Sequence, residues 1–152
     1  MLFLEESLLP IQIRPYQEAD RPFLRTLYLA SRKEAFFWLD SSDWKLEDFD
    51  RKVIGEKVIV AEQDGKILGF ASIHLHENFL HNLFISPDAQ GQGVGSHLLG
   101  IVEQNFTRTG SLKCLVKNEK AVTFYLSRGW EIISTGDSET GEYYLFHFRI
   151  KR

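Results

Sequence analysis

The chain has 152 residues, of which 43% are hydrophobic, 13% aromatic and 26% charged, and this composition predicts a soluble globular protein rather than a disordered one. A formal net charge of -3 and a pI near 6.0 argue against nucleic acid as the main partner, because phosphate binding requires a basic face. No apolar run approaches the roughly 18 residues that span a bilayer, and the single cysteine excludes an internal disulfide framework or a cysteine-based zinc cluster.

Residues 1–10 are predicted to form a short arm before a single domain at residues 11–152. No linker, repeat or low-complexity tract divides the longer segment. Within the arm, four apolar residues lead at once into Glu5 and Glu6, without the basic start or the long apolar run of a secretory signal. We therefore expect a cytoplasmic protein with no membrane partner.

The first half of the domain predicts one strand, two helices and three further strands. Asp20 followed by Pro22 predicts the start of a helix, with the Asp20 side chain as its cap. Asp43 is predicted to open a second, shorter helix. The expected elements are a strand at 11–14, helices at 20–35 and from 43, and strands at 58–61, 67–74 and 79–85, with a tight turn at 64–65.

The second half predicts two helices that alternate with strands, and then a final strand. Apolar residues from Val94 to Phe106 recur at helical spacing, and Asn118 and Gly129 are residue types that begin and end helices. The expected elements are helices at 94–106 and 118–129, strands at 112–116, 130–134 and 143–150, and a polar turn at 135–141. This order predicts an α/β (α+β) fold, in which a mixed sheet carries helices on both faces.

The most informative segment is residues 83–96, where a strand leads through a loop with glycines at 91, 93 and 95 into a helix. Glycines adopt positive φ and let backbone amides approach a ligand, and the first turn of a helix offers unpaired N–H groups. The segment therefore predicts a cradle for a diphosphate. A dinucleotide-binding fingerprint would need glycine in place of Ser96, and a P-loop would need Gly-Lys-Ser/Thr. A turn that only packs helix against strand is the structural alternative.

Two motifs at this point resemble the GNAT superfamily of acyl-CoA-dependent N-acyltransferases. The family motif Q/R-x-x-G-x-G/A is matched by residues 90–95, Gln-Gly-Gln-Gly-Val-Gly. The second family signature, N-x-x-A-x-x-F-Y-x-x-x-G-F, is matched from Asn118 to Trp130, with Trp130 in place of the usual Phe. The resemblance spans roughly residues 11–150.

The resemblance implies a mostly antiparallel sheet of about seven strands, splayed between the fourth and fifth strands to admit the pantetheine arm of acetyl-CoA. The His, Cys and acidic residues form no metal-ligand pattern, so no metal is expected. The odd spacing of Leu80 and Leu83 separately predicts a β-bulge near His81 and Asn82, and an irregular edge strand is the alternative. The cofactor-binding residues that the resemblance implies are Leu83, Phe84, Ile85, Gln90, Gly91, Gln92, Gly93, Val94, Gly95, Ser96, Asn118, Phe124 and Tyr125.

The reaction implied by the resemblance is direct attack of a primary amine on the thioester in a ternary complex. An alkylamine has a pKa of about 10.4, so a base or a desolvating site must remove its proton. The developing oxyanion needs a donor, for which the backbone N–H of Leu83 is suitable, and the leaving thiolate benefits from an acid. Tyr125 stands at the position of the family's usual general acid, although it could instead be a core aromatic residue.

The predicted base is His81, because it falls within the expected bulge and histidine titrates near neutral pH. His74, His76, Glu77 and a water chain to a carboxylate are alternatives. His74 and His76 share a strand face, but no third metal ligand follows at short range. Cys114 lies in an apolar strand and is interpreted as a packing residue.

Residues 34–50 combine carboxylates with aromatic side chains, in a region that walls the acceptor pocket in the family. This pattern predicts either an acidic, aromatic wall for a cationic amine or a solvated helix face above the core. The sequence does not choose among small amines, amino acids, aminoglycosides, polyamines, peptide N-termini and lysine side chains as the acceptor.

The aromatic C-terminal strand could pair across a homodimer. A non-catalytic acyl-CoA-binding module is the alternative function, which Tyr125 argues against because a pure binder has no use for a proton donor. A dinucleotide-binding enzyme is a third, weaker interpretation.

Overall fold

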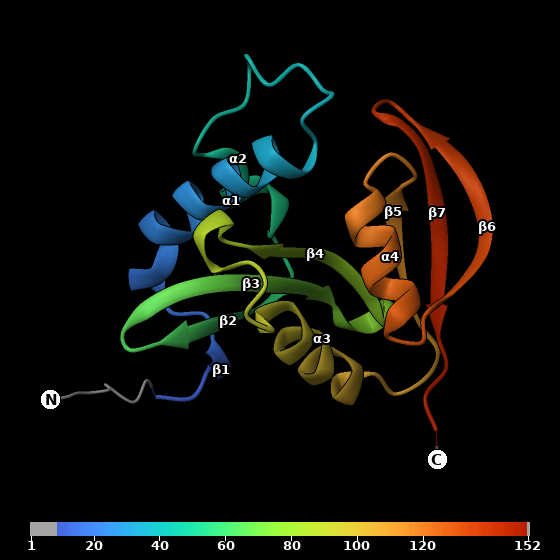
Figure 1. Cartoon of the computed structure of the whole chain (residues 1–152). Coiled ribbons are helices and arrows are strands. Elements are labelled where there is room, and N and C mark those ends of the chain that lie inside the picture. Colours follow the sequence, from blue (N-terminus) through green and yellow to red (C-terminus); the bar gives the residue numbers. More distant parts are fainter. Residues whose placement is uncertain (1–8, 152) are drawn as a thin grey trace, which may run out of the picture.

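The computed structural model describes residues 9–151, so residues 1–8 of the predicted arm lie outside the described residues. Seven strands form one sheet in the order β1-β2-β3-β4-β5-β7-β6 (Figure 1). The strands are β1 (Gln12–Pro15), β2 (Lys57–Gln63), β3 (Lys66–His74), β4 (Phe79–Ile85), β5 (Gly110–Leu115), β6 (Glu131–Ser138) and β7 (Gly141–Phe148), and the α-helices are α1 (Arg21–Ala35), α2 (Asp48–Lys52), α3 (Val94–Asn105) and α4 (Glu119–Ser127). All neighbouring strands are antiparallel except β4 and β5, which confirms the predicted fold class. None of the helices in residues 9–151 is long and apolar enough to cross a membrane.

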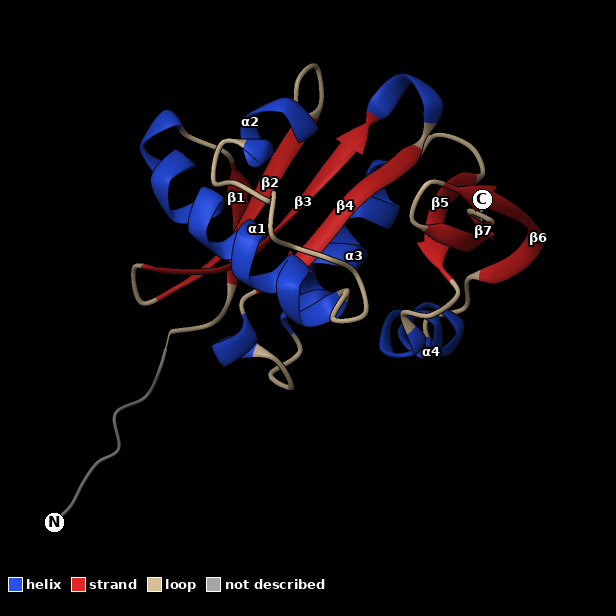
Figure 2. Ribbon diagram, turned by 90° about the horizontal axis from the view of Figure 1, so that it is seen from above, coloured by secondary structure: helices blue, strands red, loops and turns tan. Residues whose placement is uncertain are grey.

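Helices cover both faces of the sheet, as Figure 2 shows for α1 and α3. Two apolar clusters result, one with α1 and α2 and the other with α3 and α4. Consecutive residues of β2 point to opposite clusters: Val58 and Val60 pack below α1, whereas Ile59 and Ala61 pack with α3. Because both faces are buried, this strand is a continuous apolar run in the sequence rather than an alternating one.

The predicted bulge lies in β4. Ser72 of β3 pairs with Asn82, but the next residue, Ile73, pairs with Leu80, so His81 is an extra residue on β4. Asn82 turns inward, where its buried Nδ2 donates to Ser72 Oγ at 2.7 Å. The odd spacing of the leucines in the sequence therefore has the physical cause that was predicted for it.

The sheet opens between β4 and β5. The two parallel strands share one recorded pair, Phe79 with Ser111, and β5 pairs with β7 along its whole length instead. In Figure 1 the two strands diverge from this point toward the loop between α1 and α2. The predicted splay is confirmed, and it leaves the far end of β4 with one free edge.

Two predictions near the N-terminus are wrong in detail. The Asp20 side chain does not cap α1, because its carboxylate accepts hydrogen bonds from Arg14 at 2.8 and 2.9 Å and from the backbone N–H of Gln17 at 2.8 Å. The helix expected from Asp43 is reduced to α2, which begins at Asp48. The Asp48 carboxylate accepts from the backbone N–H of Lys45 at 2.9 Å and fixes a loop where a helical turn was expected.

The C-terminal hairpin also differs from its prediction. The polar stretch expected to be a turn at 135–141 continues β6 to Ser138, and only residues 139–140 turn. Since β6 is an edge strand whose side chains are almost all exposed, it carries no apolar alternation that would reveal it. The same topology places β7 between β5 and β6, so the C-terminal strand has no free edge with which to pair across a dimer.

Candidate active site

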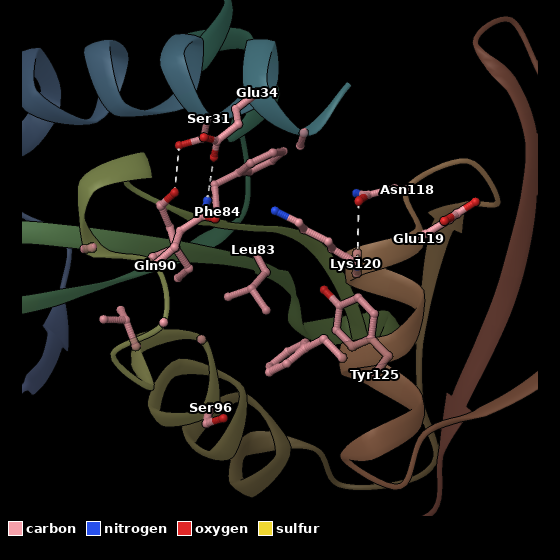
Figure 3. A pocket seen from close by; sticks show the side chains of 18 of the residues that line it. Ser31, Glu34, Leu83, Phe84, Gln90, Ser96, Asn118, Glu119, Lys120 and Tyr125 are labelled. Atoms are coloured by element: carbon pink, nitrogen blue, oxygen red, sulfur yellow. Dashed lines mark hydrogen bonds between the residues drawn. The ribbon is translucent and has the colours of Figure 1, made fainter. Parts of the chain in front are cut away.

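A groove of about 760 Å³ lies where β4 and β5 separate. Its walls are the C-terminal end of α1, the end of β4, the glycine loop before α3, and the first turns of α4 (Figure 3). We call it the glycine-loop groove. Every predicted cofactor-binding residue lines it except Gln92, which is exposed and lies outside the lining.

The glycine loop holds two residues in the left-handed conformation. Gly91 has φ 81° and Gly93 has φ 82°, and a Cβ added at either would meet no atom closer than 4.0 Å. Backbone conformation, rather than packing, therefore favours glycine at both positions. Gly93 is the N-cap of α3, and no side chain caps the helix, so its first N–H groups have no side-chain acceptor. Gly95 differs from the prediction because it is helical, and its added Cβ would lie 3.4 Å from Phe124 Cζ.

The backbone of β4 presents polar groups to the groove. Ser86 N donates to Leu68 O at 2.8 Å, which makes this a hydrogen-bonded pair of the β3–β4 ladder. Since such pairs alternate along antiparallel strands, Leu83 and Ile85 turn their N–H and C=O groups away from β3, toward the open edge. The Ile85 carbonyl accordingly lies 3.1 Å from the Ser31 hydroxyl of α1.

Glu34, Lys117 and Lys120 also line the groove, although they are not among the predicted cofactor-binding residues. Gln90 Nε2 donates to Glu34 Oε1 at 2.9 Å, which ties the glycine loop to α1. Lys117 and Lys120 line the opposite wall, and in Figure 3 the Lys120 side chain reaches across the groove toward Phe84. Gln90 and Glu34 are 56 residues apart, and the lysines resemble ordinary solvated residues at a helix start, so no sequence pattern indicates either feature.

Tyr125 joins the core to the groove. Its ring packs against Trp130 and Phe146, with centroids at 6.0 and 5.7 Å. Its hydroxyl has no hydrogen-bond partner among residues 9–151, and in Figure 3 it points toward the space between Leu83 and Lys120. Burial raises the pKa of this hydroxyl, so it stays protonated at neutral pH and can donate.

A second pocket of about 530 Å³, which we call the His81 pocket, opens between the α1–α2 loop and the β6–β7 hairpin. Trp44 and Leu39 of the loop line it on one side, and Thr140 of the hairpin lines it on the other. It meets the glycine-loop groove at residues common to both, which are Leu83, Phe84, Asn118, Ala121 and Tyr125. A molecule in each cavity would therefore meet its neighbour beside Tyr125.

His81 is held in this pocket by a carboxylate that was not predicted. Its Nδ1 lies 2.6 Å from Glu56 Oε2, and the Glu56 side chain is only 7% exposed. In the tautomer in which Nδ1 donates to this carboxylate, the Nε2 atom keeps its lone pair. The other candidates for a base, His74, His76 and Glu77, line neither cavity. Glu56 follows the turn at Gly55 and lies 25 residues before His81 in the chain. No sequence pattern therefore predicts that these two side chains meet.

Comparison with known proteins decides the family. Residues 43–146 match the family model described as an acetyltransferase (GNAT) domain, and this range holds His81, the glycine loop, Asn118 and Tyr125. The chain belongs to the GNAT acetyltransferase family. The predicted class, an acyl-CoA-dependent N-acetyltransferase, is thereby confirmed.

Individual relatives agree with this assignment. The chain is 30% identical to the peptidyl-lysine N-acetyltransferase YiaC of Escherichia coli over 126 residues, which cover 80% of this chain and 84% of the relative. The PaiA N-acetyltransferase of Thermoplasma acidophilum, solved with coenzyme A, has a TM-score of 0.76 at 16% identity and covers 93% of this chain and 100% of its own. The spermidine N-acetyltransferase of Vibrio cholerae, solved with CoA and spermine, has a TM-score of 0.71 at 19% identity, with coverages of 91% and 95%.

The carboxylates of residues 34–50 do not form an acidic wall in this GNAT acetyltransferase. No carboxylate among residues 9–151 lines the His81 pocket. Asp48 pairs with Arg32 and Arg51, and Asp50 pairs with Arg21 and Arg25. Of the two predicted alternatives, the acidic wall is therefore not found at this pocket, although the aromatic residues Phe36 and Trp44 do line it.

Cys114 is expected to resist alkylation in the folded protein. Burial raises the pKa of its thiol to about 12, so only about one molecule in ten thousand carries the thiolate at pH 8. Mass spectrometry after iodoacetamide treatment should show modification in denaturant and almost none without it. Rapid modification of the native enzyme would contradict the interpretation of Cys114 as an inert packing residue.

Proposed function

We propose that the glycine-loop groove binds acetyl-CoA, that the His81 pocket receives a primary amine, and that the acetyl group passes directly between them. The observation that carries this proposal is the junction of the two cavities at Leu83 and Tyr125. Donor and acceptor can then be bound at once and meet within the opening of the sheet. No covalent acyl-enzyme is needed, which agrees with the buried, protonated state of Cys114.

The groove offers hydrogen-bond donors that suit coenzyme A. The unobstructed loop at Gly91 and Gly93 and the uncapped start of α3 offer amides for a diphosphate, and Lys117 and Lys120 offset the carboxylates of Glu34 and Glu119 in the same lining. The outward-facing backbone of Leu83 and Ile85 offers partners for the amides of the pantetheine arm. When bound, acetyl-CoA supplies the acetyl thioester as the electrophile.

The residues beside the junction take separate roles in proton transfer. His81 Nε2 accepts a proton from the amine, and Glu56 positions the imidazole and stabilises its charged form. The backbone N–H of Leu83 donates to the thioester oxygen, where negative charge develops. Tyr125 donates its hydroxyl hydrogen bond to the sulfur as CoA leaves. His81, Leu83 and Tyr125 each line one or both cavities, and Glu56 lies behind His81, outside both linings.

Two measurements on the purified chain test this function. Calorimetry with acetyl-CoA and with NAD should show binding of acetyl-CoA only. Thiol release should then depend on both acetyl-CoA and an amine, in a panel that includes amino acids, polyamines, aminoglycosides and lysine peptides. Binding of acetyl-CoA without turnover on any amine would instead support a non-catalytic acyl-CoA-binding module.

Replacing Tyr125 with phenylalanine should lower kcat about 10- to 100-fold and leave the Kd for CoA nearly unchanged. The substitution removes the hydroxyl but keeps the ring that packs on Trp130 and Phe146. Steady-state kinetics and calorimetry measure the two effects. Tyr144→Phe is the control, because it removes a hydroxyl from a tyrosine that lines neither cavity. Equal rates for wild type and Tyr125→Phe would remove Tyr125 from the mechanism.

A further inference from the structure

The His81 pocket is cationic, although the whole chain has a net charge of -3. Three basic side chains line it, Arg32 of α1, Lys52 of α2 and Lys113 of β5, and no carboxylate in residues 9–151 does. A protonated polyamine would meet like charges on entering this pocket. The local charge therefore indicates an acceptor of a different kind.

The Arg32 side chain is held by two aromatic rings and one carboxylate, and its Nε–H has no hydrogen-bond acceptor among the described residues. Its guanidinium lies 4.3 Å from the ring centroid of Tyr28 and 4.5 Å from that of Trp44, and its Nη2 donates to Asp48 Oδ2 at 3.0 Å. The side chain is only 11% exposed. Its Nε is buried and has no hydrogen-bond partner among the described residues. A buried donor of this kind is costly unless a partner satisfies it.

The negative groups near the pocket do not neutralise it. Asp48 is shared between Arg32 and Arg51, so this cluster keeps one net positive charge. Glu56 lies outside the lining, behind His81, and its single negative charge is outnumbered by the positive charges of Lys52, Lys113 and the arginine cluster. Lys113 lies over the Tyr143 ring, with Nζ 5.0 Å from its centroid, and neither Lys113 nor Lys52 has an ion pair within residues 9–151.

We infer that the acceptor is a small amine that also carries a carboxylate, such as an amino acid. This inference rests on the proposed function, because it assigns the His81 pocket to the acceptor. The carboxylate would accept from Lys52 or Lys113 and would be attracted by the guanidinium of Arg32, which lines the same pocket. The same positive surroundings favour the neutral form of the attacking amine, which is the form that reacts.

Matched pairs of acceptors test the inference by thiol release. Glycine is compared with glycinamide, 4-aminobutyrate with its amide, and lysine with lysinamide, and spermidine represents the polyamines. A lysine peptide with neighbouring Glu, compared with the same peptide carrying Gln, shows whether the carboxylate can come from a peptide. We expect kcat/KM to be at least about tenfold higher for each carboxylate acceptor than for its amide. Among all acceptors tested, including the peptides, the highest value should belong to a free amino acid.

Variants of the pocket show whether these cations cause the preference. Lys113→Met and Arg32→Gln should each bring the carboxylate-to-amide ratio of kcat/KM down by about tenfold, toward one. Lys113 is exposed on β5, so its variant keeps the test valid if Arg32→Gln does not fold. Lys33→Met is the control, because it removes an exposed cation of α1 that lines neither cavity.

Three outcomes overturn the inference, and they can be told apart. Preference for spermidine or for the amides would overturn the carboxylate requirement while leaving the transferase intact. A peptide acceptor better than every free amino acid would overturn the small-molecule assignment. Absence of turnover with every amine, despite acetyl-CoA binding, would contradict the proposed function itself and the inference with it.

Discussion

Replacing Gly93 with alanine should weaken CoA binding about 10- to 100-fold while the protein stays folded. Gly93 has φ 82°, and alanine in the left-handed region costs about 1 kcal/mol. Within the protein the new methyl group meets no atom closer than His97 Nδ1 at 4.0 Å, so packing adds little to this cost. Gly93 lines the groove at the N-cap of α3, so a methyl group there would hinder the approach of a diphosphate to the first amides of the helix. Calorimetry with CoA and thermal unfolding measure the two effects separately.

Gly65→Ala is the matched control for this experiment. Gly65 has φ 78° in the β2–β3 turn, and a Cβ added there meets nothing within 4 Å. Its variant carries the same backbone strain but lines neither cavity. Both variants should lose about 1 kcal/mol of unfolding free energy, and only Gly93→Ala should lose CoA affinity. Unchanged affinity in folded Gly93→Ala would contradict the assignment of this loop to the diphosphate.

The parts of this site that could be predicted from the sequence are those fixed by local backbone geometry. The left-handed conformation before a helix strongly favours glycine, so the positions of Gly91 and Gly93 can be predicted from the sequence. The bulge at His81 is visible because an extra residue shifts the apolar period of β4. Asn118 accepts from Ala121 N at 3.5 Å, as its type at a helix start predicts. Each of these features is set within a few residues of chain.

The remaining parts depend on contacts between distant segments. Glu56 reaches His81 across 25 residues, and Arg25 reaches Asp50 across the same separation. The segment around Asp50 is rich in carboxylates and therefore looks acidic in the sequence. In the fold, arginines of α1 pair with Asp50 and balance its charge. Charge within a pocket follows from which side chains the fold brings together, and composition alone does not contain that information.

Replacing His81 with glutamine should reduce kcat about 10²- to 10⁴-fold near neutral pH, the range expected when a general base is lost. Glutamine keeps a polar side chain within reach of Glu56 but cannot take a proton from the amine. Because His81 lines the second pocket and not the glycine-loop groove, the Kd for acetyl-CoA should stay close to that of wild type.

The pH dependence of the His81→Gln variant separates loss of a base from loss of shape. If only the base is missing, turnover should rise steeply with pH toward the amine pKa of about 10.4, because solution then supplies the neutral amine. Rates measured from pH 7 to 10 at saturating acetyl-CoA would show this recovery. His76→Gln is the control, since His76 lines neither cavity and its loss should leave the profile unchanged. A deficit in His81→Gln that stays constant up to pH 10 would instead assign His81 to positioning the acceptor, and proton removal would then fall to another group at the junction of the two cavities.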